Sequence, residues 1–361
     1  MTNELAEDPT SAAPAPRATR ATRATRATRA TLADIAALAS VSVATVSKVL
    51  NGRDGVSDET RDRIDALLDA RGYSRRTTAH RPAPVIDVLC FDIASPFSAA
   101  MTAALERVVR RAGRGLVISG AENDYGPPAG WVDGVLHRDS LGVILLLSEL
   151  SPRIKTRLRS RDIPVVAINP FGPPAADASS IGSADWNGGF LATRHLQELG
   201  HTRIAIIKGP DGMQAAAARL AGYRTALETA GIRVRPEWIK PGRFVHADGY
   251  AQGRALLELE ERPTAVFASS DLQALGVYDA ARSLGLDIPG DLSVIGYGDL
   301  SVSQWASPAM TSVHVPIAQM AEAAMTLVER SREQPGLSFR HVDLPTELVV
   351  RASTAPPRRA S

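Results

Sequence analysis

The chain has 361 residues, 22% charged and 44% hydrophobic, which is a globular composition with room for two or three compact units. Its net charge is +2, but residues 1–84 hold 13 basic and 10 acidic residues, so the basic excess is N-terminal, where a nucleic-acid contact is first sought. The single cysteine, Cys90, excludes an intramolecular disulfide, and we expect a small buried side chain. No stretch reaches the ~18 apolar residues of a membrane span or resembles a signal peptide, so we expect a cytoplasmic protein without a membrane partner.

Residues 1–30 are rich in Ala and Pro and end in repeated Ala-Thr-Arg. Such a segment cannot bury enough apolar surface to offset its ordering entropy, which predicts a disordered basic tail. The alternative is an arm that strengthens DNA binding without sequence preference.

Residues 31–76 have the spacing of three short helices. Thr31, Ser42 and Ser57 precede them, and hydroxyl side chains at such positions cap helix N-termini. The turn between the first two helices has about three residues, so these helices must cross steeply, as in a helix-turn-helix DNA-binding domain.

The second of these helices is predicted to enter the major groove of double-stranded operator DNA. Val43 and Ala44 suit thymine methyl groups and Lys48 can reach a base acceptor, so we expect these three to contact bases. The short polar residues expected to contact phosphates are Ser42, Thr45, Ser47 and Asn51. The alternative is a helical bundle without a nucleic-acid ligand.

Residues 77–84 are a polar hinge or linker, in which Pro82 and Pro84 oppose a continuous helix. Beyond it, apolar runs alternate with amphipathic helices, which predicts parallel sheets with helices on both faces. The predicted strands are 85–91, 115–119, 142–147, 164–168, 203–208, 264–269, 292–297, 311–315 and 342–350.

These units are too many for one small sheet and predict a sensor of two lobes over residues 85–352. The predicted ranges are about 85–182 and 311–335 for lobe 1, about 183–310 and 336–352 for lobe 2, and 353–361 for a C-terminal tail.

In open parallel sheets, ligands bind beyond the carboxyl ends of the strands. Polar groups beside aromatic rings stand at these ends, and they suit the hydroxyls and the C–H face of a sugar. The candidates are Ser95, Phe97, Asn169 and Asp271, with Trp131, Trp186 and Trp305 as further aromatic candidates. The histidines lack metal-ligand spacing, and the sequence has neither a phosphate-binding loop nor a nucleophile elbow, so we expect no metal, no cofactor and no enzyme activity.

The motifs Thr31–Ala36, Val41–Gly52, Val56–Arg61 and Arg71–Tyr73 together resemble the head of LacI-type (LacI/GalR) regulators. The remainder resembles the periplasmic-binding-protein-like (type I) core of that family. The resemblance implies an all-α helix-turn-helix head on an α/β two-lobed sensor with parallel sheets. It further implies a homodimer or tetramer that represses carbohydrate-utilisation genes until a sugar or oligosaccharide releases it.

The resemblance also assigns roles within the sensor. It implies that Asp271 binds ligand hydroxyls, that Arg219 reaches the ligand, and that Phe244 stacks on it. The alternatives are a helix cap for Asp271, a surface ion pair for Arg219 and a core ring for Phe244. Segments 75–77 and 305–308 resemble regulators of plant-polysaccharide use, which makes xylo- or cello-oligosaccharides a hypothesis.

Two departures from the family pattern concern the head and its hinge. Ser40 stands where a Gly is usual, and a left-handed backbone there would cost roughly 1–2 kcal/mol. Pro82 stands where a hinge Leu would wedge into the minor groove. The hinge arginines Arg75, Arg76 and Arg81 are therefore expected to contact phosphates instead.

The sequence leaves open which small molecule is the effector and whether it weakens or strengthens binding to the operator. A regulator that needs a corepressor from another metabolite pathway is the main alternative. A cytoplasmic small-molecule carrier is weaker, because the head would then have no role. An enzyme is weaker again, because no nucleophile is paired with a base.

Overall fold

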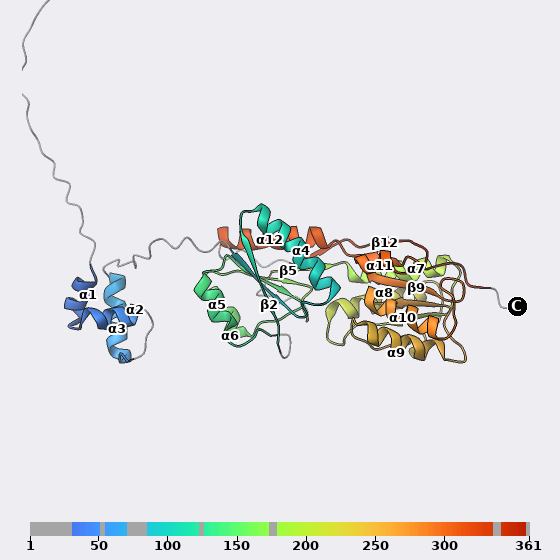
Figure 1. Cartoon of the computed structure of the whole chain (residues 1–361), viewed down its shortest axis with the longest axis horizontal. Helices are drawn as coiled ribbons and strands as arrows, with labels where there is room; N and C mark the ends of the chain where they lie inside the picture. Colours follow the sequence, from blue (N-terminus) through green and yellow to red (C-terminus); the bar gives the residue numbers. More distant parts are fainter. Residues whose placement is uncertain are drawn as a thin grey trace, which may run out of the picture. The chain divides into compact units, whose positions relative to one another are not determined.

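The computed structural model describes residues 31–50, 55–70, 85–122, 126–172, 179–334 and 341–358 (Figure 1). The chain divides into two compact units, Met1–His80 and Arg81–Ser361. The predicted tail 1–30 lies outside the described residues, as do Asn51, Pro82 and the hinge arginines Arg75, Arg76 and Arg81.

The described part of the first unit consists of α1 (Leu32–Ala39), α2 (Val43–Leu50) and α3 (Asp58–Ala70). Thr31 and Asp34 form a capping box, in which each side chain accepts a hydrogen bond from the other residue's backbone N–H. The axes of α1 and α2 differ by 100°, the steep crossing expected of a helix-turn-helix. The core includes Ile35 and Val46, whereas Leu38 on α1 is about half exposed.

The turn after α1 contains the left-handed backbone whose cost was considered for Ser40 from the sequence. Ser40 ends the helix in the left-handed conformation, with φ 54° and ψ 41°. A Gly would adopt this conformation without steric cost. The chain therefore retains the geometry of the turn at the expense of some stability.

In the described residues, the first lobe is built on a six-stranded sheet of order β11-β5-β4-β3-β1-β2. Its strands are β1 (Val85–Cys90), β2 (Gly115–Gly120), β3 (Val143–Leu146), β4 (Val165–Ile168), β5 (Ser179–Ser183) and β11 (His341–Leu344). Its helices are α4 (Pro96–Arg111), α5 (Trp131–Arg138), α6 (Pro152–Arg159) and α12 (Ile317–Glu333). Adjacent strands are parallel throughout, as predicted.

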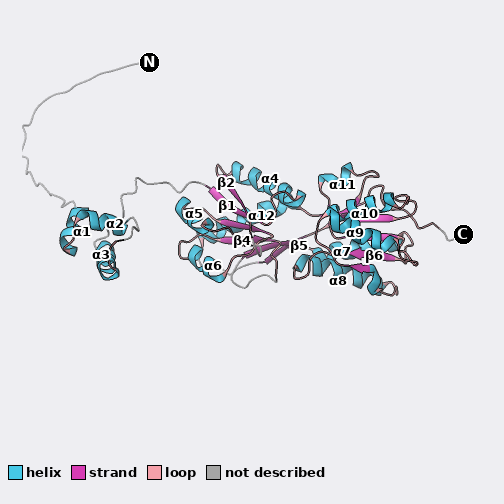
Figure 2. Cartoon of the chain, turned by 60° about the horizontal axis from the view of Figure 1, so that its bottom comes forward, coloured by secondary structure: helices cyan, strands magenta, loops and turns pink. Residues whose placement is uncertain are grey.

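The second lobe repeats this plan, with a sheet of order β12-β10-β9-β8-β6-β7 (Figure 2). Its strands are β6 (Ile204–Ile207), β7 (Ile239–Lys240), β8 (Ala265–Ala268), β9 (Ser293–Gly298), β10 (Thr311–His314) and β12 (Glu347–Val349). Its helical segments are α7 (Asp185–Glu198), α8 (Gln214–Thr229), η1 (Pro236–Trp238), α9 (His246–Leu257), α10 (Asp271–Ser283) and α11 (Ser301–Trp305). The edge strand β12 departs from the parallel pattern, because it pairs antiparallel with β10.

Two strands lie in the opposite lobe from the one predicted. β10 was assigned to lobe 1 but pairs with β9 in lobe 2, and β11 was assigned to lobe 2 but pairs with β5 in lobe 1. The single predicted strand 342–350 is in fact β11 and β12, one in each sheet. The chain crosses between the lobes after β5, after β10 and after β11, and apolar runs alone do not show at which crossing a strand changes sheets.

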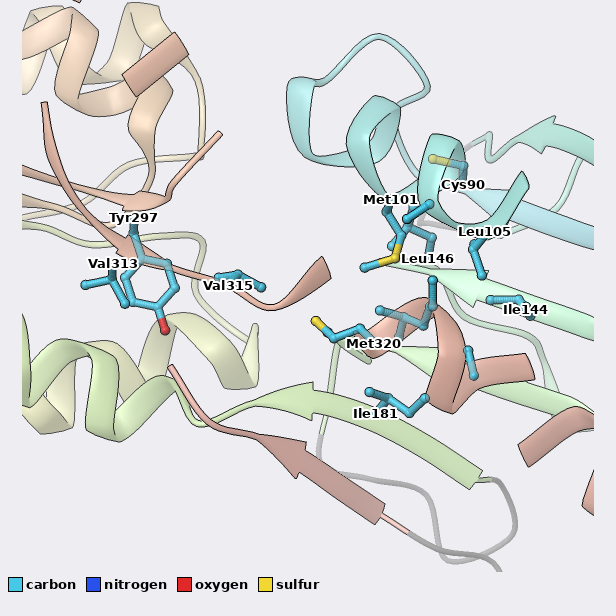
Figure 3. Packing of buried hydrophobic residues seen from close by; sticks show 14 of the residues in the cluster. Cys90, Met101, Leu105, Ile144, Leu146, Ile181, Tyr297, Val313, Val315 and Met320 are labelled. Atoms are coloured by element: carbon cyan, nitrogen blue, oxygen red, sulfur yellow. The ribbon is translucent and has the colours of Figure 1, made fainter. Parts of the chain in front are cut away.

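One hydrophobic cluster extends through both lobes (Figure 3). Tyr297 and Val313 belong to it from β9 and β10, and Met101 and Met320 belong to it from α4 and α12. Cys90 is fully buried in the same cluster and burial raises the pKa of its thiol, as expected for an unreactive core side chain. Within the described ranges no single helix is long and apolar enough to cross a bilayer, and α1 and α2 pass that test only when the bent pair is taken together.

Candidate effector site and DNA-reading helix

The predicted base-contacting side chains lie on the outer surface of α2. Val43 is 47% exposed, and Ala44 and Lys48 are exposed as well. An exposed valine at a helix N-terminus is available to a thymine methyl group. Of the predicted phosphate contacts, Ser42 is exposed, whereas Thr45 and Ser47 are half-buried.

Two of these hydroxyls also form the N-cap of α2. The Oγ of Ser42 accepts a hydrogen bond from the Thr45 N–H at 3.1 Å and lies 2.8 Å from Thr45 Oγ1. This local pairing satisfies a helix N–H that would otherwise lack a partner.

A cavity of about 280 Å³ lies where the chain crosses between the two lobes. The first lobe contributes the ends of β4 and β5 and part of β11, and the second lobe contributes the first turns of α7 and α8. Its polar and aromatic side chains are Asn169, Ser183, Asp185, Trp186, Asn187, Gln214, His341 and Asp343. Its position beyond the strand ends agrees with the general rule for ligands of parallel sheets.

Two buried polar atoms in this wall have no hydrogen-bond partner. They are Oδ1 of Asn169 at the end of β4 and Oγ of Ser183 at the end of β5. Asn169 also has a left-handed backbone, with φ 48°. Buried polar groups are ordinarily paired, so two unpaired ones in residues that line a cavity mark a polar part of its wall.

The wall of the cavity is connected to Arg219 through Asp185. Nε of Arg219 donates to Asp185 Oδ1 at 2.7 Å, and the Tyr297 hydroxyl donates to the same oxygen at 2.8 Å. Nη1 of Arg219 donates to the Ser269 carbonyl at 2.7 Å. Arg219 is thus a buried ion-pair partner, not the surface one considered from the sequence.

Burial and the nearby Asp185 carboxylate together determine the protonation states of Arg219 and Tyr297. Burial lowers the pKa of Arg219, but the Asp185 carboxylate and Tyr297 outweigh it, so the pKa is raised and the guanidinium stays charged. Burial, supported by the Asp185 charge, raises the pKa of the Tyr297 hydroxyl well above its ordinary value. Tyr297 therefore remains a neutral donor to Asp185.

Two aromatic rings surround the Arg219 guanidinium. Its carbon lies 3.6 Å from the Tyr297 ring centre and 5.2 Å from that of Phe244. Phe244 thus lies beside Arg219, but it does not itself line the cavity, and its predicted stacking on the ligand stays a prediction.

Close contact between α7 and α8 brings Asp185 to Arg219. A Cβ atom on Gly189 would lie 2.2 Å from the Arg219 carbonyl oxygen, and one on Gly222 would lie 2.1 Å from the Trp186 carbonyl oxygen. Only glycine permits this approach. The Gly-Gly pair that follows Asp185-Trp186-Asn187 was the sequence signal for it.

The two lobes touch beside the cavity. The Gln214 N–H, at the start of α8, donates to the Phe171 carbonyl at 3.2 Å. Leu147 and Phe171 of the first lobe pack against a small cluster around Met213 of the second lobe, together with Phe244. A ligand in the cavity would therefore act on groups that already hold the lobes together.

Asp271 is fully buried and does not line the cavity. Its carboxylate accepts hydrogen bonds from the Leu300 N–H at 2.7 Å and the Ser312 hydroxyl at 2.6 Å. Burial raises the pKa of this carboxyl to about 6. Nor is Asp271 the helix cap considered from the sequence, because the side chain of Ser270 caps α10.

The remaining sequence candidates are also placed away from the cavity. Ser95 caps α4 through its hydroxyl, and Phe97 packs half-buried against the core. Trp305 is 78% exposed on α11, and Trp131 is buried in α5. Of the sequence candidates, the structure thus brings Asn169 and Trp186 to the cavity wall. Arg219 is joined to this wall through Asp185, and Phe244 lies beside Arg219.

Several cavity residues had escaped sequence reasoning: Ser183, Asp185, Asn187, Gln214, His341 and Asp343. Ser183 ends β5, whose sequence Ser-Ser-Ile-Gly-Ser has no apolar run to predict a strand. His341 and Asp343 lie on β11, which the sequence had placed in the other lobe.

Comparison with known proteins agrees with this architecture. Residues 31–76 match the family model described as bacterial regulatory proteins, lacI family. Residues 193–354 match a periplasmic binding protein-like domain. Together they confirm the predicted class of fold, a helix-turn-helix head followed by a two-sheet, mostly parallel α/β sensor.

Full-length relatives extend the similarity over most of the chain. The HTH-type transcriptional repressor PurR of Mannheimia succiniciproducens is 30% identical over 85% of this chain and 93% of its own length. The solved structure of the transcriptional regulator CelR–cellobiose complex is 31% identical, covers 90% of this chain and 100% of its own, and has a TM-score of 0.67. A LacI family regulator from Enterococcus faecium with bound ribose is 26% identical, covers 75% and 99% of the two chains, and has a TM-score of 0.68.

Proposed function

This chain belongs to the LacI family of DNA-binding transcriptional repressors, and we propose that it represses carbohydrate-utilisation genes until a neutral sugar or oligosaccharide occupies the cavity between its lobes. Membership of this family sets aside the carrier and enzyme alternatives. The family's members bind operator DNA and small-molecule effectors, so the identity of the effector is what the proposal adds.

The observation that carries the proposal is the pair of unpartnered polar atoms, Asn169 Oδ1 and Ser183 Oγ, in two residues that line a cavity together with Trp186. A sugar offers hydroxyls to the former and a C–H face to the latter. Each buried group that lacks a partner costs stability, and a ligand hydroxyl removes that cost.

The charges of the lining favour a neutral ligand. Among the described residues of the cavity wall, none is Lys or Arg, whereas Asp185 and Asp343 are both present. The nearby Arg219 is already paired with Asp185. Within the described part of this site, a phosphate or carboxylate would meet no free Lys or Arg, which disfavours sugar phosphates.

Two of the similar structures support a sugar. One is described as a complex with cellobiose and another as having bound ribose. For this chain, a sugar seated on Asn169, Ser183 and Gln214 would contact both lobes at once. It can shift the arrangement of the lobes only by the difference between its affinities for the two arrangements.

The second part of the proposal concerns how α2 binds operator DNA, and it uses the contacts predicted from the sequence. We propose a homodimer, or a tetramer built from it, that places two copies of α2 about one DNA turn apart in the cytoplasm. Val43, Ala44 and Lys48 would then contact bases. The hinge arginines Arg75, Arg76 and Arg81 would contact phosphates.

The proposal is tested by gel shift with the intergenic DNA upstream of the gene, carried out in the presence of glucose, cellobiose, xylose and xylobiose. Specific binding that weakens with one of these sugars is the expected result. Specific binding that no neutral sugar alters, together with no heat in calorimetric titration, would contradict it.

A corepressor is the second candidate, because several curated relatives carry the name PurR and are 30–31% identical over 85–86% of this chain. A purine base such as hypoxanthine is the probe for it. The two candidates have opposite signs: an inducing sugar weakens binding to the operator, whereas a corepressor strengthens it.

A further inference from the structure

Trp186, at the start of α7, and Asp343, on β11, line the same interlobe cavity. We propose that Trp186 and Asp343 form a second sugar subsite, so that the ligand is a neutral disaccharide or longer chain rather than a monosaccharide. This inference rests on the proposed function and adds the length of the ligand and the residues that recognise it.

The cavity has an inner and an outer part that differ in exposure. Asn169 and Ser183 are 7% and 4% exposed, whereas Trp186 is 45% exposed. All three line the same cavity. In the proposed binding mode, one sugar ring would bind Asn169 and Ser183, and a second ring would lie on the more exposed indole.

The indole is held in place before any ligand binds. Its ring centre lies 5.3 Å from that of Phe190, one helical turn further along α7, and the two planes differ by 13°. The guanidinium carbon of Arg194 lies 5.7 Å from the Phe190 ring centre. An exposed large aromatic side chain is costly in water, and a fixed one loses little rotamer freedom on binding. Trp186 therefore has the properties of a preformed platform for the C–H face of a sugar.

The wall contributed by β11 supplies hydrogen-bonding groups beside this platform. Nε2 of His341 lies 3.1 Å from Asp343 Oδ1, and Nδ1 of the same ring lies 2.9 Å from Ser180 Oγ. These contacts orient the Asp343 side chain, which is 52% exposed and lines the cavity. A carboxylate that keeps one oxygen on a histidine can accept a sugar hydroxyl with the other.

A second exposed tryptophan, Trp305, provides a matched control. Trp305 is more exposed than Trp186, at 78%, but it lies on α11 and does not line the cavity. Calorimetric titrations of the full chain, Trp186→Ala, Trp305→Ala and Asp343→Asn with glucose, cellobiose, xylose and xylobiose therefore test the subsite. Retained binding to the upstream DNA without sugar verifies that each variant is folded.

We expect the unmodified protein to bind one disaccharide at least about tenfold more tightly than its monosaccharide. Trp186→Ala should weaken disaccharide binding about tenfold while leaving monosaccharide binding unchanged, and Asp343→Asn should act in the same direction. Trp305→Ala should change neither.

The outcomes separate the inference from the proposed function. If the unmodified protein binds a monosaccharide as tightly as the disaccharide, or if Trp186→Ala binds both like the unmodified protein, the second subsite is overturned and a sugar-responsive repressor stands. If the unmodified protein binds none of the four sugars and binds hypoxanthine, the proposed function and the subsite are overturned together.

Discussion

The Nε atom of Arg219 lies 2.7 Å from the Asp185 Oδ1 atom, and the two side chains, only 8% and 7% exposed, form a buried ion pair at the edge of the interlobe cavity. A buried pair costs desolvation when it forms, and it costs more when only one partner is removed, because a charge is then buried alone. The ion pair therefore holds the Arg219 guanidinium in one position. This is the side chain that the family resemblance predicts to contact the ligand.

Asp185→Ala should lower the free energy of unfolding of the sensor by about 3–5 kcal/mol, because it leaves Arg219 charged and unpaired. The double variant Asp185→Leu with Arg219→Met should lose less than this single variant. Urea unfolding measures both. Glu106→Ala, which breaks the exposed pair with Arg110, is the control and should have little effect. Equal losses for the buried and the exposed pair would contradict the prediction.

Ser183→Ala should stabilise the ligand-free protein by about 1 kcal/mol, because it removes a buried hydroxyl without a partner. The same change should weaken sugar binding about tenfold, because the ligand loses that partner. Ser148→Ala is the matched control: its buried hydroxyl donates to the Leu146 carbonyl at 3.0 Å, so its removal should destabilise the fold. A loss of stability in Ser183→Ala comparable to that of the control would show that the hydroxyl is satisfied.

Asp271 should make the stability of the sensor depend on pH. Burial raises its pKa from 3.8 to about 6, an effect only partly offset by hydrogen bonds from Ser312 and Leu300. As the pH rises, the unfolded chain releases this proton first, so the contribution of Asp271 is full below pH 4 and is lost through about pH 6. The loss amounts to about 3 kcal/mol.

Asp271→Asn does not titrate, so its free energy of unfolding relative to the unmodified protein should rise by about 3 kcal/mol between pH 4 and pH 7.5. Asp299, which raises the pKa, and Arg351, which lowers it, stay unchanged in this comparison. Urea unfolding at several pH values measures the effect. Asp133→Asn, at an exposed carboxyl paired with Arg157, should show no such rise. A pH-independent difference for Asp271→Asn would refute the assignment.

Lys48→Ala should reduce affinity for the specific operator by about 1–3 kcal/mol and relax its sequence preference, because Lys48 is predicted to reach a base acceptor. Binding measured at several salt concentrations tests this role. A salt slope reduced by about one, with an equal loss on non-specific DNA, would place Lys48 on a phosphate instead. Arg63→Ala, an exposed cation on α3, is the control.

The head was accessible to sequence reasoning because its signals are local. Thr31 and Asp34 are three residues apart and cap α1 as a hydroxyl and a carboxylate at that spacing do in other helices. The left-handed conformation of Ser40 was considered because Ser40 stands where the family usually has Gly in this turn. Most sensor strands were found in the same way, because a buried parallel strand is a short apolar run.

The effector site was less accessible because its residues are joined by packing and not by spacing. Asp271 and Trp305 stand near strand ends, as a ligand-binding residue would, yet one is buried at the start of α10 and the other is on the surface. Conversely, Ser183 and Asp343 belong to strands that the apolar pattern missed or assigned to the other lobe.

By itself, the sequence determined the helix-turn-helix, the alternation of strands and helices, and the family, because caps, periodicity and motifs depend on residues a few positions apart. The tertiary structure alone decided that Arg219 meets Asp185, 34 residues away, and that Tyr297, 112 residues from Asp185, donates to the same carboxylate oxygen. It also decided that Trp186, and not Trp305, faces the cavity. The physical reason is that three crossings of the described chain between the lobes, with glycine contacts between α7 and α8, bring distant residues together, and no local pattern encodes where those crossings meet.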